Sequence, residues 1–535
     1  MKRKLPDVKI MMNEDPNHMI GEMNAARSYL GDDFRLTDSD AKAYADQYLG
    51  TQLTDFAFNV NFLLSVYPSK VRDSYAYKSK EQTYNLKPEI IEKNEYYDMF
   101  IRDGFDIFEA WNRHFHNNGV RTWISFRMND VHGIAEDNTF MLSKFWMDHP
   151  EYRRVRHRPR AGYFDGTLDY GKKEVRDDMM AYMREALERY DVDGIELDFL
   201  REPFCFQIGH EYEGLNIMND YIRSIRAMLD EFEQKRGHTL YMCVRTYCMP
   251  LTSYYLGFDF ITWAKEELVD LIVATPRWVS VDNDMPIELW KKMLEPYNVR
   301  LGAGIDLILR AHPQGEFYYL NTHETALGSC AQNLSAGADF TYLFNYMRPV
   351  FIDYDHQISK ERCLHEEIYM KDFYLQLYKN GGELQTAINA PRRHVVTFHD
   401  LSEEWQPSAN ALPLTAQKGY FKQVRARCGI VPEGSQVYLI LGARGKDSED
   451  VKPEDFKVFI NSTPLTYGGK CDVTPYTRWQ GYYFKIEDTS VLDIANVVEI
   501  SSDGADFDVE YAELRVNASL EKSQWEKDNF AWRNL

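Results

Sequence analysis

The 535-residue sequence lacks several motifs that define common enzyme classes. It contains no Cys-x-x-Cys pair, which argues against a structural zinc site, and no Gly-x-Ser-x-Gly sequence, which argues against a serine hydrolase. No glycine-rich phosphate loop follows the first predicted strand. A metal-dependent hydrolase would place paired histidines near strand ends, whereas the candidates here are isolated: His18, His132, His210 and His312. We therefore predict neither a bound metal nor a cofactor.

Long apolar runs are also absent, and none approaches the length of a membrane span, so we predict no transmembrane helix. The seven cysteines are scattered and odd in number, which argues against a disulfide framework. The first six residues, Met-Lys-Arg-Lys-Leu-Pro, lack the apolar stretch of a signal peptide. The expected compartment is therefore periplasmic or extracellular if a signal segment was removed, and cytoplasmic otherwise.

The charge balance excludes one class of partner. Asp and Glu outnumber Lys and Arg by 83 to 62, which gives a formal net charge of −21. Such a chain is repelled by nucleic acid and by anionic membranes, so we expect neither as a partner. Aromatic residues make up 14% of the chain, a content that suits ring stacking against sugars, although most of them must form core. The oligomeric state is left open.

Strand-like runs alternate with helical segments through the first 380 residues. Eight such repeats predict a (β/α)₈ barrel over residues 1–380 rather than an open doubly wound sheet. From residue 381 onward, short alternating runs separated by turn residues predict an all-β, jelly-roll-like sandwich over residues 381–535. The predicted barrel strands are 8–12, 55–60, 121–126, 194–198, 240–244, 269–274, 299–303 and 340–344.

The fourth predicted strand, Gly194–Asp198, carries two carboxylates two residues apart. Glu196 and Asp198 must share one face of the strand, and in a barrel covered by helices that face points inward. An unpaired buried charge is costly. Polar groups at the carboxyl ends of barrel strands usually belong to an active site. The alternative is that the two carboxylates take part in structural ion pairs inside the barrel. For Glu196 the structural and the active-site roles are about equally favoured, and for Asp198 the active-site role is favoured.

Arginines on the neighbouring strands are expected to flank these carboxylates. Arg127 and Arg245 fall on the predicted inward faces, and guanidinium groups hold carboxylates ionised. An ionised Asp198 suits a nucleophile or a stabiliser of a cationic transition state, so a second carboxyl group must supply the proton. The candidates for that role are Glu202 and Asp306, with Glu14, Asp282 and Asp284 as rivals.

Amides and an indole recur where the predicted strands end, and such groups bind hydroxyls and stack on sugar rings. Each alone is more often a turn residue or a core group, and their recurrence at strand ends favours the binding role. An anionic sugar or a sulfate is a lesser alternative ligand for the two arginines. The predicted substrate-binding residues are Asn13, Glu14, Asn61, Arg127, Glu196, Arg201, Arg245, Trp278 and Asn345, and Asn59 and Asn129 also cap strands.

The stretch Leu168-Asp-Tyr-Gly-Lys-Lys-Glu-Val-Arg, continuing to Tyr190-Asp-Val-Asp-Gly-Ile-Glu-Leu-Asp-Phe, resembles the glycosyl-hydrolase-10-like barrel proteins. The resemblance implies a glycoside hydrolase acting on an oligo- or polysaccharide, with Asp198 in the active site. The same stretch partly resembles chitinase-type barrels, but Leu200 stands where their catalytic Glu belongs. The C-terminal region looks like sandwiches appended to bacterial glycan-degrading enzymes, where a buttressing role is favoured over sugar binding. A non-catalytic glycan-binding barrel and a sugar lyase or isomerase are the alternatives.

Overall fold

A computed structural model of the chain describes residues 3–15, 34–77, 95–134, 141–155, 165–200, 202–277, 280–311, 319–346, 367–398, 412–446, 449–473, 477 and 479–521. Contacts between residues divide the chain into two compact units. The first contains the chain up to residue 274 and residues 289–302. The second contains residues 275–288, 303–346 and the described chain from residue 367 onward.

Eight strands form a closed barrel, which confirms the predicted fold class. The order around the barrel is β1-β11-β8-β6-β5-β4-β3-β2, and the four pairings that join β1 to β5 through β2, β3 and β4 are parallel. Two strands match their predicted bounds and the other six lie within three residues of them. The strands are β1 Ile10–Glu14, β2 Leu53–Asn59, β3 Arg121–Arg127, β4 Gly194–Asp198, β5 Tyr241–Tyr247, β6 Leu271–Thr275, β8 Arg300–Ile305 and β11 Phe340–Phe344.

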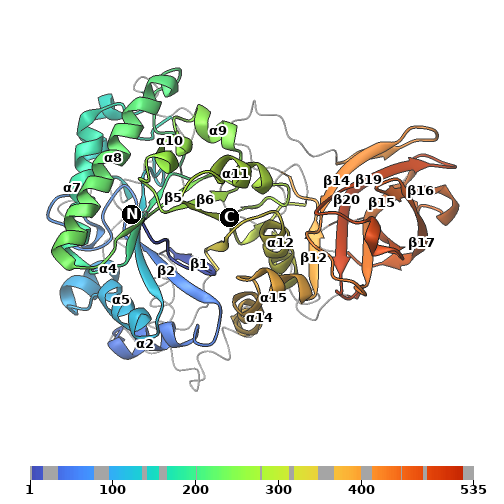
Figure 1. Ribbon diagram of the computed structural model, residues 1–535, viewed down its shortest axis with the longest axis horizontal. Coiled ribbons are helices and arrows are strands. Elements are labelled where there is room, and N and C mark those ends of the chain that lie inside the picture. The colour runs from blue at the N-terminus through green and yellow to red at the C-terminus, as the bar shows by residue number, and fades with distance from the viewer. Residues whose placement is uncertain are drawn as a thin grey trace. The chain divides into compact units, whose positions relative to one another are not determined.

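Amphipathic helices cover the outer face of the strands (Figure 1). On β2 the outward rings pack on α5: Phe56 stacks on Phe115 with centroids 4.0 Å apart, and Phe58 stacks on Phe108 at 5.2 Å. Burying each such ring contributes about 1.5–3 kcal/mol. The helices of the first unit are α2 Asp38–Asp46, α4 Glu95–Tyr97, α5 Ile107–Asn117, α6 Lys144–Asp148, α7 Lys173–Arg189, α8 Glu211–Arg236, α9 Pro250–Tyr255 and α10 Phe260–Lys265, and α11 Ile287–Leu294 spans both units.

The sequence of residues 94–117 predicts one continuous helix, but in the structure this segment is interrupted. A π-helical turn over Asp98–Arg102 follows α4, and α5 begins only at Ile107. Gly104 adopts a positive φ of 65°, and Asp106 caps α5 by accepting from the N–H groups of Phe108 and Glu109. The apolar periodicity continues through this segment and so predicted one helix, whereas a glycine turn and a new N-cap separate two.

The interior face of the barrel is set by the alternation of strand residues, as predicted. Gly194 lies beside Trp123 in the β3–β4 register, and a Cβ at position 194 would come within 2.4 Å of the indole. The glycine therefore makes room for a large ring at the amino end of the interior. Trp123 Nε1 donates to Asp55 Oδ1 at 2.8 Å, and Arg121 holds the same carboxylate through two bonds of 2.8 and 2.7 Å.

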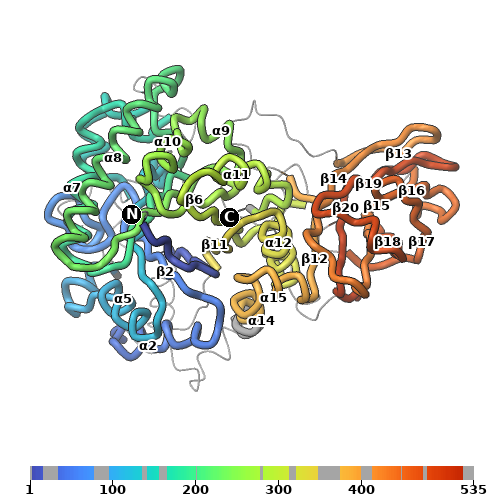
Figure 2. Tube along the Cα trace, viewed as in Figure 1, coloured from blue at the N-terminus to red at the C-terminus, as the bar shows by residue number. Residues whose placement is uncertain are grey.

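The second unit contains an antiparallel nine-stranded sheet around one apolar core (Figures 1 and 2), the all-β region that the sequence predicted. Its strands follow the order β12-β20-β15-β18-β17-β16-β19-β14, and β13 pairs with β20. Their bounds are β12 Arg392–Val395, β13 Leu414–Ala416, β14 Lys422–Arg427, β15 Val437–Gly445, β16 Phe456–Ile460, β17 Thr463–Cys471, β18 Gln480–Ile486, β19 Ala495–Ser502 and β20 Phe507–Val516.

The second unit also contains helices α12 His323–Ser335, α14 Glu367–Asn380 and α15 Leu384–Asn389, and a small sheet of β7 Ser280–Val281, β9 Ile308–Leu309 and β10 Tyr319–Leu320. The predicted helix 358–378 corresponds to α14, and its first nine residues lie outside the described chain. Two strands of the nine-stranded sheet were not predicted, β13 and β17, and in β17 Pro464 and Gly468-Gly469 interrupt the strand-like pattern. Among the described residues, no helix is long and apolar enough to cross a membrane.

Candidate active site

Polar side chains gather at the carboxyl ends of β3, β4 and β5 because the register aligns them. Ser125 lies beside Glu196, and Arg127 lies beside Asp198. Across the next pairing, Glu196 lies beside Cys243 and Asp198 beside Arg245. These residues are 0–2% exposed, so the strand-four carboxylates do point into the barrel interior, as the sequence predicted.

Asp198 is held from two directions. Its Oδ1 accepts from the backbone N–H of Leu200 at 3.0 Å, and its Oδ2 accepts from Arg245 Nη1 at 3.3 Å. Both side chains of the Asp198–Arg245 ion pair are almost fully buried. The predicted placement of Arg245 beside Asp198 is therefore confirmed.

Arg127 takes different partners from those expected. It donates through Nη2 to Asp15 at 2.6 Å and through Nη1 to Asp130 at 3.1 Å. Burial opposes its charge, but the attraction of Asp15, Asp130 and then Asp198 outweighs burial and raises the pKa of Arg127. The charge of Asp198 therefore acts on Arg127, while the direct bonds of Arg127 go to Asp130, three residues beyond the end of β3, and to Asp15, the residue after β1.

Glu196 lies one layer deeper, nearer the amino end of β4. Its Oε2 accepts from Asn13 Nδ2 at 3.1 Å, and the same amide donates to Ser125 Oγ at 2.9 Å. Burial, followed by the nearby charge of Glu196, raises the pKa of the Cys243 thiol well above its usual value. The Cys243 thiol, which lies beside Glu196, is therefore protonated. Asn13 links β1 to β4 across the barrel interior.

Asn61 supports the site through the backbone. Its Nδ2 donates to the carbonyl of Arg127 at 2.9 Å and its Oδ1 accepts from the Arg127 N–H at 3.2 Å. Asn59 in turn accepts from the Asn61 N–H at 3.2 Å. The two asparagines thus fix the end of β3 and the direction in which Arg127 leaves it. Glu14 accepts a bond from Tyr44, a residue of α2 in the outer helix layer.

The candidate proton donors fall in different parts of the chain. Glu202 belongs to the same unit as Asp198 and is 1% exposed. Asp306 belongs to the second unit, where its Oδ1 accepts from Leu307 N–H at 2.6 Å and its carbonyl accepts from Asn321 and Tyr346. Asp284 is engaged by Arg425 and Arg427 of the β-sheet.

Three predicted binding residues have no described contact with this cluster. Asn345 ends β11 in the second unit with a φ of 64°, the left-handed conformation that asparagine tolerates. Arg201 and Trp278 lie outside the described residues. Asn129 binds the backbone of two other segments: it donates to the carbonyls of Leu168 and Phe204 and accepts from the Leu168 N–H.

His132, which appears in the sequence only as an isolated histidine, joins the cluster. His132 Nδ1 lies 2.9 Å from both carboxylate oxygens of Asp130, and its backbone N–H donates to the same carboxylate at 2.9 Å. Phe62 contacts the imidazole edge to face and also lies under the Arg127 guanidinium. The Asp130-x-His132 spacing was the available signal, because an aspartate two residues before a histidine can orient its ring. The His132 side chain is 28% exposed.

Comparison with known proteins finds similarity to solved structures at low sequence identity. No family model and no curated protein matches the sequence. Alpha-L-fucosidase isoenzyme 1 from Paenibacillus thiaminolyticus is 12% identical over 93% of this chain and 97% of its own, with a TM-score of 0.34. A Thermotoga maritima alpha-fucosidase solved with fucose is 8% identical over 92% and 95%, at 0.31. A chitinase from Paenibacillus sp. str. FPU-7 is 9% identical over 96% of this chain and 55% of its own, at 0.37.

Proposed function

We propose that this chain is a glycoside hydrolase that cleaves a glycosidic bond in an oligo- or polysaccharide with carboxylates at the carboxyl ends of its barrel strands. The observation that carries the proposal is Asp198, which ends β4 and is held by Arg245 and by the Leu200 N–H. The resemblance of the stretch around it to glycosyl-hydrolase-10-like barrels points the same way.

In this proposal Asp198 acts as the nucleophile or stabilises the positive charge that develops on the sugar ring. Arg245 donates to its Oδ2 and the Leu200 N–H donates to its Oδ1, and together they orient the carboxylate. Arg127 supplies a second positive charge nearby. Glu196 and Asn13 form the layer beneath, which sets the position of β4 relative to β1.

The proton for the leaving group comes from Glu202 or Asp306. Glu202 is the first choice because it lies four residues beyond Asp198 in the same unit and is buried. A general acid contributes roughly 10²–10⁴-fold to the rate. Turnover of Glu202→Gln and Asp306→Asn therefore assigns the role, with the larger loss marking the acid.

The deciding experiment compares Asp198→Asn with Asp55→Asn. Both remove a buried carboxylate from the same barrel, at its carboxyl and amino ends respectively. Release of reducing ends from a panel of polysaccharides should fall roughly 10²–10⁴-fold in Asp198→Asn and stay near wild type in Asp55→Asn, with both variants folded by circular dichroism. Full burial of Asp198 is also what a structural ion pair would show, so an active Asp198→Asn enzyme would refute the assignment.

The Asp130–His132 pair favours a second candidate, a sugar lyase that abstracts a proton with His132. A histidine oriented by a carboxylate suits that step, and Arg127 would neutralise an acidic substrate. Lyase products carry a conjugated double bond that absorbs in the ultraviolet, whereas hydrolysis adds water and produces no such absorbance. Absorbing product from wild type, abolished in His132→Ala, would favour the lyase over the hydrolase.

A further inference from the structure

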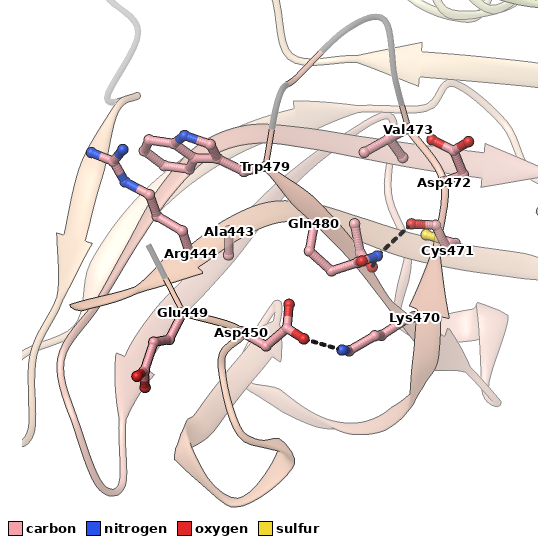
Figure 3. A pocket seen from close by; sticks show the side chains of 11 residues that line it. Ala443, Arg444, Glu449, Asp450, Lys470, Cys471, Asp472, Val473, Trp479 and Gln480 are labelled. Atoms are coloured by element: carbon pink, nitrogen blue, oxygen red, sulfur yellow. Dashed lines mark hydrogen bonds and ion pairs between the residues drawn. The ribbon is translucent and has the colours of Figure 1, made fainter. Parts of the chain in front are cut away.

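The β-sheet of the second unit contains a pocket of about 770 Å³. The residues that line it lie between positions 443 and 481, and none of them belongs to the candidate active site. It forms where three neighbouring strands meet: the end of β15, the end of β17 and the start of β18 (Figure 3). This volume falls within the ~300–1,000 Å³ typical of small-molecule sites.

We propose that this pocket is a carbohydrate-binding site for a neutral glycan. Trp479 provides the aromatic wall, and its side chain is half-buried, so the ring is firmly placed but reachable. Figure 3 shows the indole beside the Arg444 guanidinium, whose Cζ lies 4.1 Å from the ring centroid. An indole presents the flat apolar surface that a pyranose ring stacks on.

Charged side chains supply both donors and acceptors around the indole. Lys470 pairs with Asp450 across the pocket, as Figure 3 shows, and Glu449 and Asp472 add two more carboxylates. Vicinal hydroxyl groups need such a mixture, because each hydroxyl both donates and accepts.

The charge balance selects against an anionic ligand. Three carboxylates line the pocket against two cations, and each cation already lies near a carboxylate: Lys470 contacts Asp450, and Arg444 lies 3.7 Å from Asp508. A ligand carboxylate or sulfate would have to displace one of these groups. A ligand without charge can bind among them as they stand.

The pocket floor is preformed. Gln480 donates through Nε2 to the carbonyls of Cys471 and Gly481, both at 2.9 Å, which ties β17 to β18 beneath the opening. A Cβ on Gly481 would come within 2.6 Å of the Cys471 carbonyl, so this close approach requires glycine. A rigid floor lowers the entropy that binding must overcome.

The inference is tested by affinity electrophoresis of the full chain through gels containing galactomannan, xylan or polygalacturonate. All proteins carry Asp198→Asn, so that the gel polysaccharide is not degraded. Trp479→Ala is compared with Tyr420→Ala, which removes an exposed aromatic ring of the same unit outside the pocket. Lys470→Met is a second pocket variant, and circular dichroism checks that each variant is folded.

A neutral polysaccharide should retard the parent protein and Tyr420→Ala equally. Trp479→Ala should bind at least about tenfold more weakly, since stacking on the lost ring contributes to that extent, and Lys470→Met several-fold more weakly. Retardation that survives Trp479→Ala would place binding elsewhere, for example in the barrel, and overturn the inference. Retardation by polygalacturonate alone, or by none of the three, would overturn it too. Trp479-dependent binding by a chain that hydrolyses nothing would leave this inference standing while the proposed function fails.

Discussion

Each unit buries an ionic cluster, and the two clusters are built differently. In the β-sheet, Glu513 is surrounded by Arg393, Arg515 and the hydroxyl of Tyr511, at distances of 2.6 to 3.4 Å. Burial raises the pKa of Glu513, but the two guanidinium groups outweigh it and bring the pKa down to about 2. One carboxylate is thus saturated by partners from adjacent strands β12 and β20.

The barrel cluster spreads its charges over separate strands instead. Arg127 divides its bonds between Asp15 and Asp130, and Arg245 reaches Asp198 at 3.3 Å. The barrel carboxylates lie at the strand ends where barrel enzymes carry their chemistry, whereas the Glu513 cluster lies on β20 and the edge strand β12. Burial and ion pairing occur in both clusters, so these two properties alone do not distinguish a functional site from a structural one.

The largest expected effect concerns the saturated cluster. Glu513→Gln leaves two buried guanidinium groups without their anion, which should lower the free energy of unfolding by about 3–5 kcal/mol. Because the folded pKa of Glu513 lies below that of an unfolded glutamate, its stabilisation is present above pH ~4.3 and is lost as the pH falls through about 2. Denaturant unfolding at neutral pH measures the cost, and unchanged turnover of the folded variant checks that the cluster is structural.

The matching change in the barrel should affect activity. Arg245→Met removes the cation beside Asp198, and we expect turnover to fall roughly 10²-fold, the range for losing one charge-stabilising group. Arg393→Met is the control, since it removes an equally buried arginine from the β-sheet. Initial rates of reducing-end release, corrected for folded fraction, separate the two. Equal turnover in both variants would mean that the barrel cluster is structural as well.

A third prediction concerns the amino end of the barrel. Burial raises the pKa of Asp270 to about 6, although the Met242 N–H, Arg226 and Arg3 all favour its ionised form. The folded pKa exceeds the unfolded value, so stabilisation by the protonated group is full below pH ~4 and is lost as the pH rises through about 6. The free energy of unfolding of Asp270→Asn minus that of wild type should therefore increase by about 2–3 kcal/mol as the pH is raised from 4 to 7.5. A flat difference over that range would contradict the assignment.

The smallest effect is expected at His132 if the hydrolase proposal holds. His132→Gln keeps a polar group near Asp130 and should change turnover less than about tenfold, because the proposed proton transfer uses carboxyl groups. The pH profile of kcat should keep both limbs. A loss of 10²-fold or more, together with the disappearance of one limb, would transfer the catalytic role from the carboxylates to the histidine.

The sequence predicted the barrel well because its strands are buried runs bounded by polar residues, and β4 and β11 match to the residue. The inward orientation of Glu196, Asp198 and Arg245 followed from alternation alone. The partners of Arg127 could not be predicted in this way, because Asp15 and Asp130 lie beyond the ends of strands, where alternation no longer applies. His132 was missed for the same reason, and β17 because its glycines resemble a turn. The domain boundary at residue 380 and the catalytic roles stay predictions.

The contact between Gly194 and Trp123 has a consequence for how this sequence can change. Any side chain at position 194 meets the indole, so an alanine there requires a smaller residue at 123, and that residue would surrender the bond to Asp55. A change of side-chain size at position 194 or 123 therefore requires a compensating change at the other, and it also affects the hydrogen bond to position 55. Related sequences should show them varying together, even though positions 123 and 194 are 71 residues apart in the chain.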